Sequence, residues 1–296
     1  MDIYRTKTLR KEFDNLVERS GAKWNIIEQD YILSWVLFGI VSVDKLAQHL
    51  VFKGGTALKK CYFGDYRFSQ DLDFSVCGEY PKNEELLMLI EQACSISETK
   101  LRLLGRNIDI ACTRYLEKQP HPENQEAFTI KARLPWQKNL YTNVMIEVTT
   151  QERVLLNPDK RRIIHGYGEE IDSYVKVYRL EEIIAEKIRA LLQFAKKLHE
   201  RGWGRSRVRD YYDIWNILTL YSRELDHSIL PDLTTRKCAL KQIKFTSFLD
   251  IFAKELIDNA SGEWDIWLGA VNAEQHPKER IFEELMHEMK KLDGLR

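Results

Sequence analysis

Two aspartates separated by a single residue, Asp71 and Asp73, lie in a short run of residues that favour a β-strand. Alternate residues of a strand share a face, so the two carboxylates would point the same way from backbone positions about 7 Å apart. Leu72 and Phe74 would face the opposite way, into the core. Like charges held this close destabilise a fold unless something compensates them, and paired carboxylates bind hard divalent cations. The pattern therefore predicts a site for Mg²⁺.

A pair of glycines, Gly54 and Gly55, stands between an apolar run and a helix-forming run that contains Lys59 and Lys60. Glycine lets the main chain approach a ligand closely, and the start of a helix presents backbone N–H groups to anions. A diglycine alone is also typical of an ordinary corner between a strand and a helix. Its combination with the two aspartates favours phosphate binding. Because the pattern G-x-x-x-x-G-K-[ST] does not occur, a P-loop ATPase is not expected.

A third carboxylate is expected where two cations are clamped for in-line displacement at phosphorus. Glu147 stands among Val144, Ile146 and Val148, so alternation puts it alone on the polar face of a predicted strand. Asp109, flanked by two isoleucines, is the alternative third acid. For either residue, an acid on an edge strand that faces water is the non-functional interpretation.

One lysine, Lys187, falls inside the apolar stripe of a predicted helix that begins at Leu180. Its ammonium either extends to water or meets a buried anion. Asp210 and Asp213 stand one turn apart on the next predicted helix, which is apolar almost all round, so both acids need partners. We expect Lys187 to supply one partner and a triphosphate with its metals to organise the rest; a purely structural ion pair is the alternative. On this view Lys187→Met removes activity and leaves the fold nearly intact.

The segment between these two helices is rich in cations. From residue 195 to residue 209 it holds six Lys or Arg residues against one Glu, with Trp203 between two glycines. Such a basic segment with an aromatic side chain suits an RNA backbone and a stacked base. Arg201, Arg205 and Arg207 are therefore predicted to bind RNA. The alternative is a run of charge that merely faces solvent.

The elements that must position these residues change in character along the chain. The first fifty residues have helical patterns, the next hundred combine short β-rich runs with one helix, and the remainder is helical almost throughout. We therefore predict an α/β (α+β) fold, with a mixed sheet flanked by helices in residues 1–174 and an all-α domain in residues 175–296. A polar stretch with two glycines, residues 157–174, marks the boundary. The expected strands are 50–53, 71–76, 108–115, 127–134 and 143–149, and the expected helices are 83–104, 180–198, 208–221, 240–257 and 278–291.

Composition limits the possible partners. Lys and Arg together number 45, as do Asp and Glu, so the net charge is zero and no global field drives the chain onto nucleic acid or membrane. Any RNA partner must be held by a local patch. The five cysteines include no C-x-x-C pair, which argues against a zinc knuckle or a secreted disulfide framework and favours the reducing cytoplasm. No run reaches the roughly 20 apolar residues that cross a bilayer, and we expect neither a signal peptide nor a membrane partner.

Taken together, these motifs resemble the AbiEii/AbiGii family of nucleotidyltransferase-like toxins, which share the minimal fold of the DNA polymerase β-type nucleotidyltransferases. The resemblance covers most of the chain. It runs through Glu28-Gln29-Asp30-Tyr31, residues 52–58, residues 67–74, Lys187 and Arg209-Asp210-Tyr211-Tyr212-Asp213.

The resemblance implies roles for individual residues. Asp71 and Asp73 would be the metal carboxylates, and Lys187 and Asp210 the family's second catalytic pair. The residues assigned to the nucleotide are Gly54, Gly55, Thr56, Lys59, Arg67 and Ser69.

The resemblance also implies a function, because family members are toxins of two-gene toxin–antitoxin or phage-abortive systems. We expect an NTP- and Mg²⁺-dependent nucleotidyltransferase that modifies an RNA, with tRNA as the expected acceptor, and a cognate antitoxin as partner. One alternative is transfer to a small molecule such as an aminoglycoside, which would not need the basic segment. Another is a nucleotide-binding module without turnover that sequesters a partner, and the intact carboxylates count against it.

Overall fold

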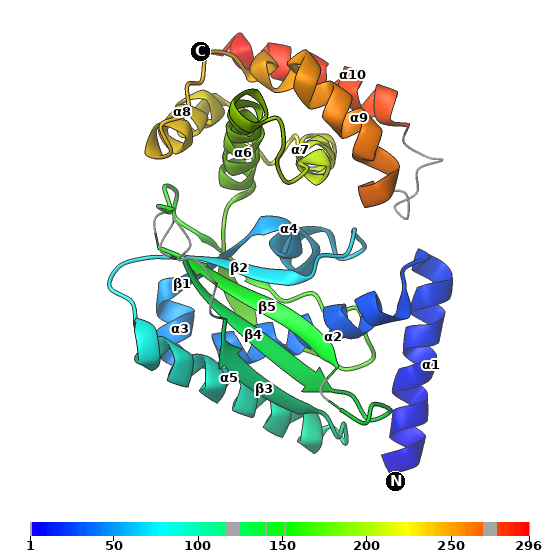
Figure 1. Ribbon diagram of the computed structural model, residues 1–296. Helices are drawn as coiled ribbons and strands as arrows, with labels where there is room; N and C mark the ends of the chain where they lie inside the picture. The colour runs from blue at the N-terminus through cyan, green and yellow to red at the C-terminus, as the bar shows by residue number, and fades with distance from the viewer. Residues whose placement is uncertain (1, 116–124, 140, 151, 269–276, 296) are drawn as a thin grey trace. The chain divides into compact units, whose positions relative to one another are not determined.

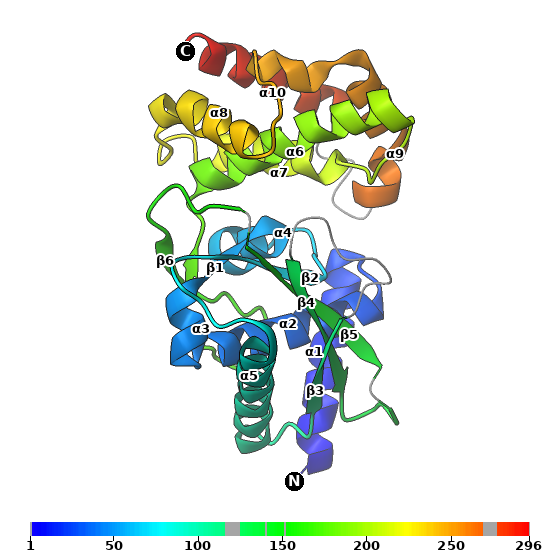
Figure 2. The same ribbon diagram turned by 60° about the vertical axis from the view of Figure 1, so that its left-hand side comes forward.

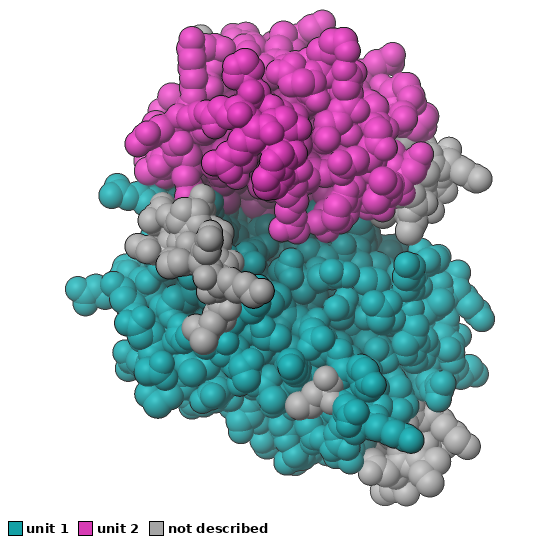
Figure 3. Space-filling view, in the orientation of Figure 1, with its two compact units in different colours: residues 1–178 teal, residues 179–296 magenta. Residues whose placement is uncertain are grey.

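The chain divides into two compact units, residues 1–178 and residues 179–296, coloured separately in Figure 3. The structure is a computed structural model that describes residues 2–115, 125–139, 141–150, 152–268 and 277–295, with the backbone alone for residues 2–7. Whether each unit folds by itself, as a two-domain chain requires, stays a prediction.

Unit 1 combines helices with a seven-stranded sheet (Figure 1). Its helices are α1 (Asp2–Ser20), α2 (Trp24–Val41), α3 (Asp44–His49), α4 (Gly54–Ala57) and α5 (Asn83–Leu103), and α4 continues into a π-helical turn, η1 (Leu58–Phe63). Its strands are β1 (Leu50–Lys53), β2 (Asp71–Val76), β3 (Asp109–Arg114), β4 (Gln125–Arg133), β5 (Thr142–Thr149), β6 (Asp159–Arg162) and β7 (Tyr174–Val177).

The sheet is mixed and has the order β3-β4-β5-β2-β1-β7-β6. Strand β2 pairs in parallel with β5 and antiparallel with β1, so the strand with the two aspartates lies near the middle. One face is apolar, because alternate residues such as Phe52, Phe74 and Ile146 are fully buried. Helices α2 and α5 pack against each other and against strands of this sheet. The mixed α/β fold with flanking helices is thus confirmed.

The Glu28-Gln29-Asp30-Tyr31 motif belongs to this packing. The carboxylate of Glu28 accepts hydrogen bonds from the indole N–H groups of Trp24 and Trp136, at 2.8 and 2.7 Å. Asp30 forms a buried ion pair of 2.8 Å with Lys60 of η1. Burial by itself would raise the pKa of Asp30, but the Lys60 ammonium outweighs it and holds the pKa below its usual value. The motif therefore ties α2 to the turn that follows the diglycine.

Strand β6 lies within the polar stretch 157–174, and β7 begins at its last residue, Tyr174; the sequence predicted neither strand. The two glycines there, Gly166 and Gly168, belong to the connection between the strands, and the strands themselves alternate. Along β7 every second residue is buried, as Val175 and Val177 are. The polar partners on the other face hide this alternation from a hydropathy reading.

Unit 2 is helical. It contains α6 (Leu180–Arg201), α7 (Val208–Leu220), η2 (His227–Ile229), α8 (Leu230–Leu240), η3 (Phe248–Phe252), α9 (Lys254–Leu268) and α10 (Lys278–Asp293). The single helix expected over 240–257 is wrong. Helix α8 ends where it was to begin, Gln242 has a φ of 54°, and the side chain of Ser247 caps a new turn by accepting the N–H of Leu249. Among the described residues no helix has the length and apolar character that crossing a bilayer requires.

Candidate active site

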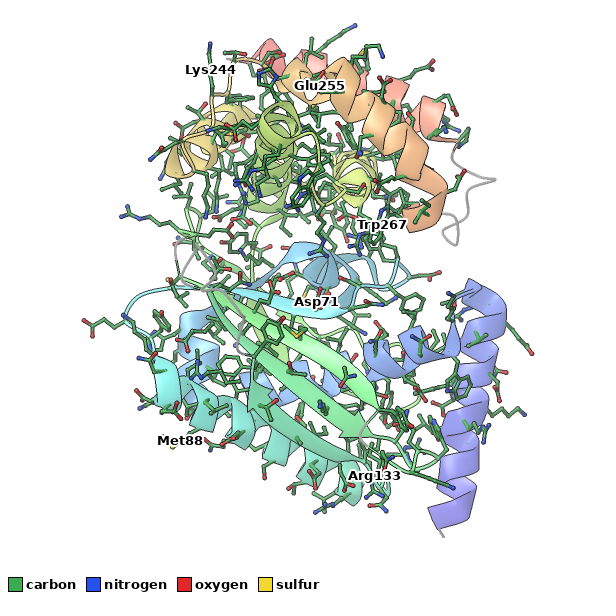
Figure 4. The ribbon with its side chains drawn as sticks, viewed as in Figure 1. Asp71, Met88, Arg133, Lys244, Glu255 and Trp267 are labelled. Carbon is green, nitrogen blue, oxygen red and sulfur yellow. The ribbon has the colours of Figure 1, made fainter. Side chains whose placement is uncertain are left out.

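The two aspartates and Glu147 share one face of the sheet. Asp71 and Asp73 are the first and third residues of β2, and both are half-buried. In the parallel ladder Asp73 lies opposite Glu147 of β5, and Asp71 lies opposite Met145. Cross-strand partners project to the same side, so all three carboxylates leave the sheet together. In Figure 4, Asp71 lies at the end of the sheet close to α4.

The diglycine brings the main chain against this face. Gly54 has a φ of 78°, which L-residues rarely adopt, and a Cβ there would come within 2.4 Å of Asp73 Oδ2. A Cβ on Gly55 would come within 2.5 Å of Arg67 Nη2. Both glycines are therefore required by close approach, one to a carboxylate and one to a guanidinium. The sequence predicted that glycine here lets the main chain approach a ligand, but it did not predict the contact between Gly54 and Asp73.

The loop between η1 and β2 carries Arg67 back over the diglycine. Arg67 is buried, and its guanidinium has its place beside Gly55. Thr56 holds the start of β2, because its hydroxyl donates to the carbonyl of Asp71 at 2.5 Å. The diglycine thus lies between a buried cation, Arg67, and a carboxylate, Asp73. Ser69, the other residue of the R-x-S pattern, is half-buried in the same loop.

Lys59 lies beneath this loop. Its ammonium donates to the carbonyls of Gly64 and Tyr66, at 3.2 and 3.0 Å, and lies 4.3 Å from the ring centroid of Phe68. Burial lowers the pKa of Lys59 to about 8. Direct contact with a nucleotide would require Lys59 to leave these partners. In this structure it holds the loop that bears Arg67.

Two of these carboxylates suit Mg²⁺. Mg²⁺ is commonly held by one or two carboxylates together with substrate phosphate oxygens, and Asp71 and Asp73 fit this mode. Within the described ranges, no group of three or more His, Cys, Asp or Glu is assembled for a metal. Glu147 instead accepts a hydrogen bond from the side-chain amide of Gln125, at 2.5 Å. A nucleotide would therefore have to complete the coordination.

The alternative third acid, Asp109, lies elsewhere. It is on the edge strand β3, three places from β2 in the sheet, and pairs with Arg133. Arg133 is at the opposite end of the sheet from Asp71 in Figure 4. The register therefore favours Glu147 over Asp109 as a third carboxylate.

We call the group of Gly54, Gly55, Thr56, Asp71 and Asp73 the nucleotide cradle. Sequence reasoning missed one ion pair next to it. Lys53, the last residue of β1, is buried and pairs with Glu152. Lys53 lies opposite Asp73 in the antiparallel ladder, so a cation flanks the carboxylates on the side away from Glu147. Its position directly before the diglycine was the available signal.

In unit 2, Lys187 is the centre of a buried ion cluster. Its ammonium lies 2.8 Å from Asp210 Oδ1 and 2.6 Å from Asp213 Oδ2, and Lys187 is 7% and Asp213 0% exposed. Burial by itself would raise the pKa of Asp210, but Lys187 and Arg207 outweigh it and hold the pKa below its usual value. The ammonium therefore meets buried anions and does not extend to water. The expectation that Lys187→Met spares the fold is reversed, because the change would leave two buried carboxylates without their cation.

The basic segment between α6 and α7 is only partly open to a ligand. Arg201 and Arg205 are exposed, and the Trp203 ring beside them is 72% exposed. Arg207 instead lies 3.6 Å from Asp210 Oδ2, so part of its charge serves the ion cluster. Helix α6 ends at Gly202, whose φ of 74° turns the chain out.

A mixed sheet whose central strand presents two aspartates beside a diglycine turn is the fold of a nucleotidyltransferase. The family model for nucleotidyl transferase AbiEii toxins of type IV toxin–antitoxin systems matches residues 35–286. The chain therefore belongs to the AbiEii family, and it is a nucleotidyltransferase toxin of such a system with an NTP substrate and a cognate antitoxin.

Solved structures agree on the fold. The chain is similar to MenT4, a nucleotidyltransferase toxin from Mycobacterium tuberculosis H37Rv, with a TM-score of 0.50 and 18% sequence identity over 96% of this chain and 99% of that chain. No curated protein matches the sequence.

Proposed function

We propose that the chain transfers a nucleotidyl group from an NTP to an RNA in a Mg²⁺-dependent reaction, with tRNA as the expected acceptor. The observation that carries the proposal is the shared face of Asp71, Asp73 and Glu147, with Asp73 lying against Gly54. Carboxylates and a close-approaching main chain are what a metal-bound triphosphate needs.

The reaction is an in-line displacement at the α-phosphorus. A hydroxyl oxygen of the acceptor forms a bond to that phosphorus, the bond to the pyrophosphate oxygen breaks, and the hydroxyl proton passes to water. When bound, Mg²⁺ neutralises charge on the phosphate oxygens and on the leaving pyrophosphate. Asp71 and Asp73 would hold that ion.

The remaining residues bind and orient the nucleotide. Gly54 and Gly55 let the phosphates reach the main chain, and the guanidinium of Arg67 supplies positive charge beside them. Lys59 keeps the Arg67 loop in place through the carbonyls that it binds. Lys187 and Asp210 stay candidate catalytic residues on the strength of the family resemblance, and Arg201, Arg205 and Arg207 stay candidate RNA contacts. The five cysteines are free thiols, which supports a cytoplasmic site of action.

A transfer assay tests the proposal. Purified protein is incubated with each α-labelled NTP and total RNA, in Mg²⁺ or in EDTA. We expect label in RNA with Mg²⁺ and none with EDTA. Asp71→Asn and Asp73→Asn should remove the label, and the matched control Asp109→Asn should not, because Asp109 lies on the far strand. Label that appears only when a small-molecule acceptor such as an aminoglycoside is supplied would contradict an RNA acceptor, and NTP binding without any transfer would indicate a module without turnover.

A further inference from the structure

Strands β6 and β7 present one exposed face that is basic and aromatic. In their antiparallel ladder Lys160 lies opposite Lys176, and Arg162 lies opposite Tyr174. All four side chains are exposed, Tyr174 by 52%. The Lys160 ammonium lies 5.7 Å from the Tyr174 ring centroid.

This arrangement costs stability when no ligand is bound. Like charges directly opposite each other on paired strands repel. Arg162 is partly neutralised by Glu170 and Asp172, at 2.5 and 3.5 Å. Neither Lys160 nor Lys176 has an acidic partner in the part of the chain that the structure describes, and Lys176 donates only to the carbonyl of Gln48.

Protection of the sheet edge does not explain the whole face. Lysines on edge strands prevent pairing with a second chain, and Lys160 on β6 fits that role. Strand β7, however, lies between β1 and β6, so its Lys176 and Tyr174 protect no edge. Two opposed lysines and an exposed tyrosine beside them match the needs of single-stranded nucleic acid, which offers phosphates and bases for stacking.

We propose that the β6–β7 face, defined by Lys160, Arg162, Tyr174 and Lys176, binds a single-stranded part of the acceptor RNA. The proposal rests on the proposed function and deepens it, because it names where unit 1 holds the acceptor. The register puts this face on the same side of the sheet as Asp73, since Phe52 pairs with both Phe74 and Val177 on the opposite side.

The face is nevertheless separate from the nucleotide cradle. On this side of the sheet Val51 and Tyr178 come between the two, and both are buried. The Tyr178 hydroxyl donates to Ser75 at 2.7 Å, which fixes it there. Changes on the β6–β7 face should therefore leave NTP binding intact.

The test measures equilibrium binding of a short fluorescein-labelled single-stranded RNA by anisotropy over a range of salt concentrations, with the full chain. The variants are Lys160→Gln/Lys176→Gln and Tyr174→Ala. The matched control is Lys11→Gln/Lys100→Gln, which removes the same charge from exposed positions on α1 and α5. Thermal melting and NTP binding are recorded for each protein.

The plot of log K against log salt has a negative slope, and the double Lys variant should make it shallower by about 1.4, the value for two single-strand phosphate contacts. Tyr174→Ala should weaken binding about fivefold or more through loss of a stacked base. The control should bind like wild type. Unchanged affinity in both variants, or an equal loss in the control, overturns the proposal.

Transfer assays on the same proteins separate this inference from the proposed function. If wild type transfers label to RNA while the β6–β7 variants bind RNA normally, this surface is refuted and the function stands. If wild type binds RNA through this face but transfers nothing to it, the proposed function fails and the surface stands.

Discussion

Replacing Lys187 by Met should destabilise unit 2 strongly, because one ammonium holds two buried carboxylates. Methionine keeps the apolar stem and removes the cation, which leaves Asp210 and Asp213 facing each other. Asp213 is fully buried, so water cannot replace the lost partner. Breaking a buried ion pair from one side costs about 3–5 kcal/mol.

The melting temperature gives the size of the effect. For a cooperative unit of about 120 residues, the entropy of unfolding converts each kcal/mol into roughly 4 °C, so the expected loss is about 12–20 °C. Lys187→Met/Asp213→Asn should recover part of this loss, because only one of the two carboxylates that Lys187 held is then still charged.

The pH dependence has a definite sign. The pKa of Asp210 is lowered in the folded wild type, so its contribution is present above the unfolded pKa and disappears as pH falls through the folded pKa. In the Met variant the Lys187 ammonium no longer offsets burial, so the pKa of Asp210 rises above its wild-type value, and protonation relieves part of the destabilisation. The gap in stability between variant and wild type should therefore shrink as pH falls from 7 toward about 4.

Calorimetry at several pH values measures the loss of stability. Transfer assays well below the melting point of the variant then test whether Lys187 is catalytic. A variant that melts within about 2 °C of wild type at pH 7 would refute the buried-cluster reasoning. A variant that is folded at the assay temperature and inactive supports a catalytic Lys187, whereas activity that follows the folded fraction identifies a positioning residue.

Four further outcomes are expected. Lys59→Met should raise KM for NTP more than it lowers kcat, because the loop that bears Arg67 loses its clamp; an effect on kcat alone would contradict this. The pKa of Lys59 falls from 10.5 in the unfolded chain to about 8 on folding, so between these pH values unfolding takes up a proton. The free energy of unfolding of wild type should therefore rise relative to that of Lys59→Met as pH rises from 8 to 10.5, which urea titrations measure. Wild type should gain about 2.7 kcal/mol from Mg²⁺ with NTP at a hundredfold excess over Kd, and Asp73→Asn much less; an equal thermal shift would show Asp73 to be structural. Gly55→Ala should displace Arg67 and raise KM, whereas Gly166→Ala, where a Cβ meets open space, should match wild type in the same kinetics.

The carboxylate face was predictable because alternation is local. Leu72 and Phe74 are buried while Asp71 and Asp73 are only half-buried, as a period of two requires. Strands β6 and β7 were missed for the converse reason, since polar residues occupy the exposed positions and the segment has no apolar run. Strand β7 is held in the sheet by its pairing with β1, a contact between distant residues that the local sequence pattern does not reveal.

The surroundings of the site depend on contacts between distant residues, which no local pattern records. The sequence placed Lys59 near a phosphate, but its partners are carbonyls of a loop whose path is set by tertiary packing. The sequence singled out Lys187, Asp210 and Asp213, because charged residues within apolar helical faces need partners. It predicted that Lys187 pairs with one of the two acids, but that the ammonium meets both depends on how α6 packs on α7.

The late position of β7 in the chain has a consequence for synthesis of the toxin. Strand β1 is made early, yet one of its two neighbours follows about 120 residues later, which corresponds to roughly 6–25 s of translation. Until then the edge of β1, with the apolar Val51 and Phe52, is open to pairing with another chain. A ribosome that stalls after β2 and before β7 would leave a fragment that contains both aspartates and lacks the strands on the β7 side of the sheet. Such a fragment would be a substrate for chaperones and proteases before it could act as an enzyme.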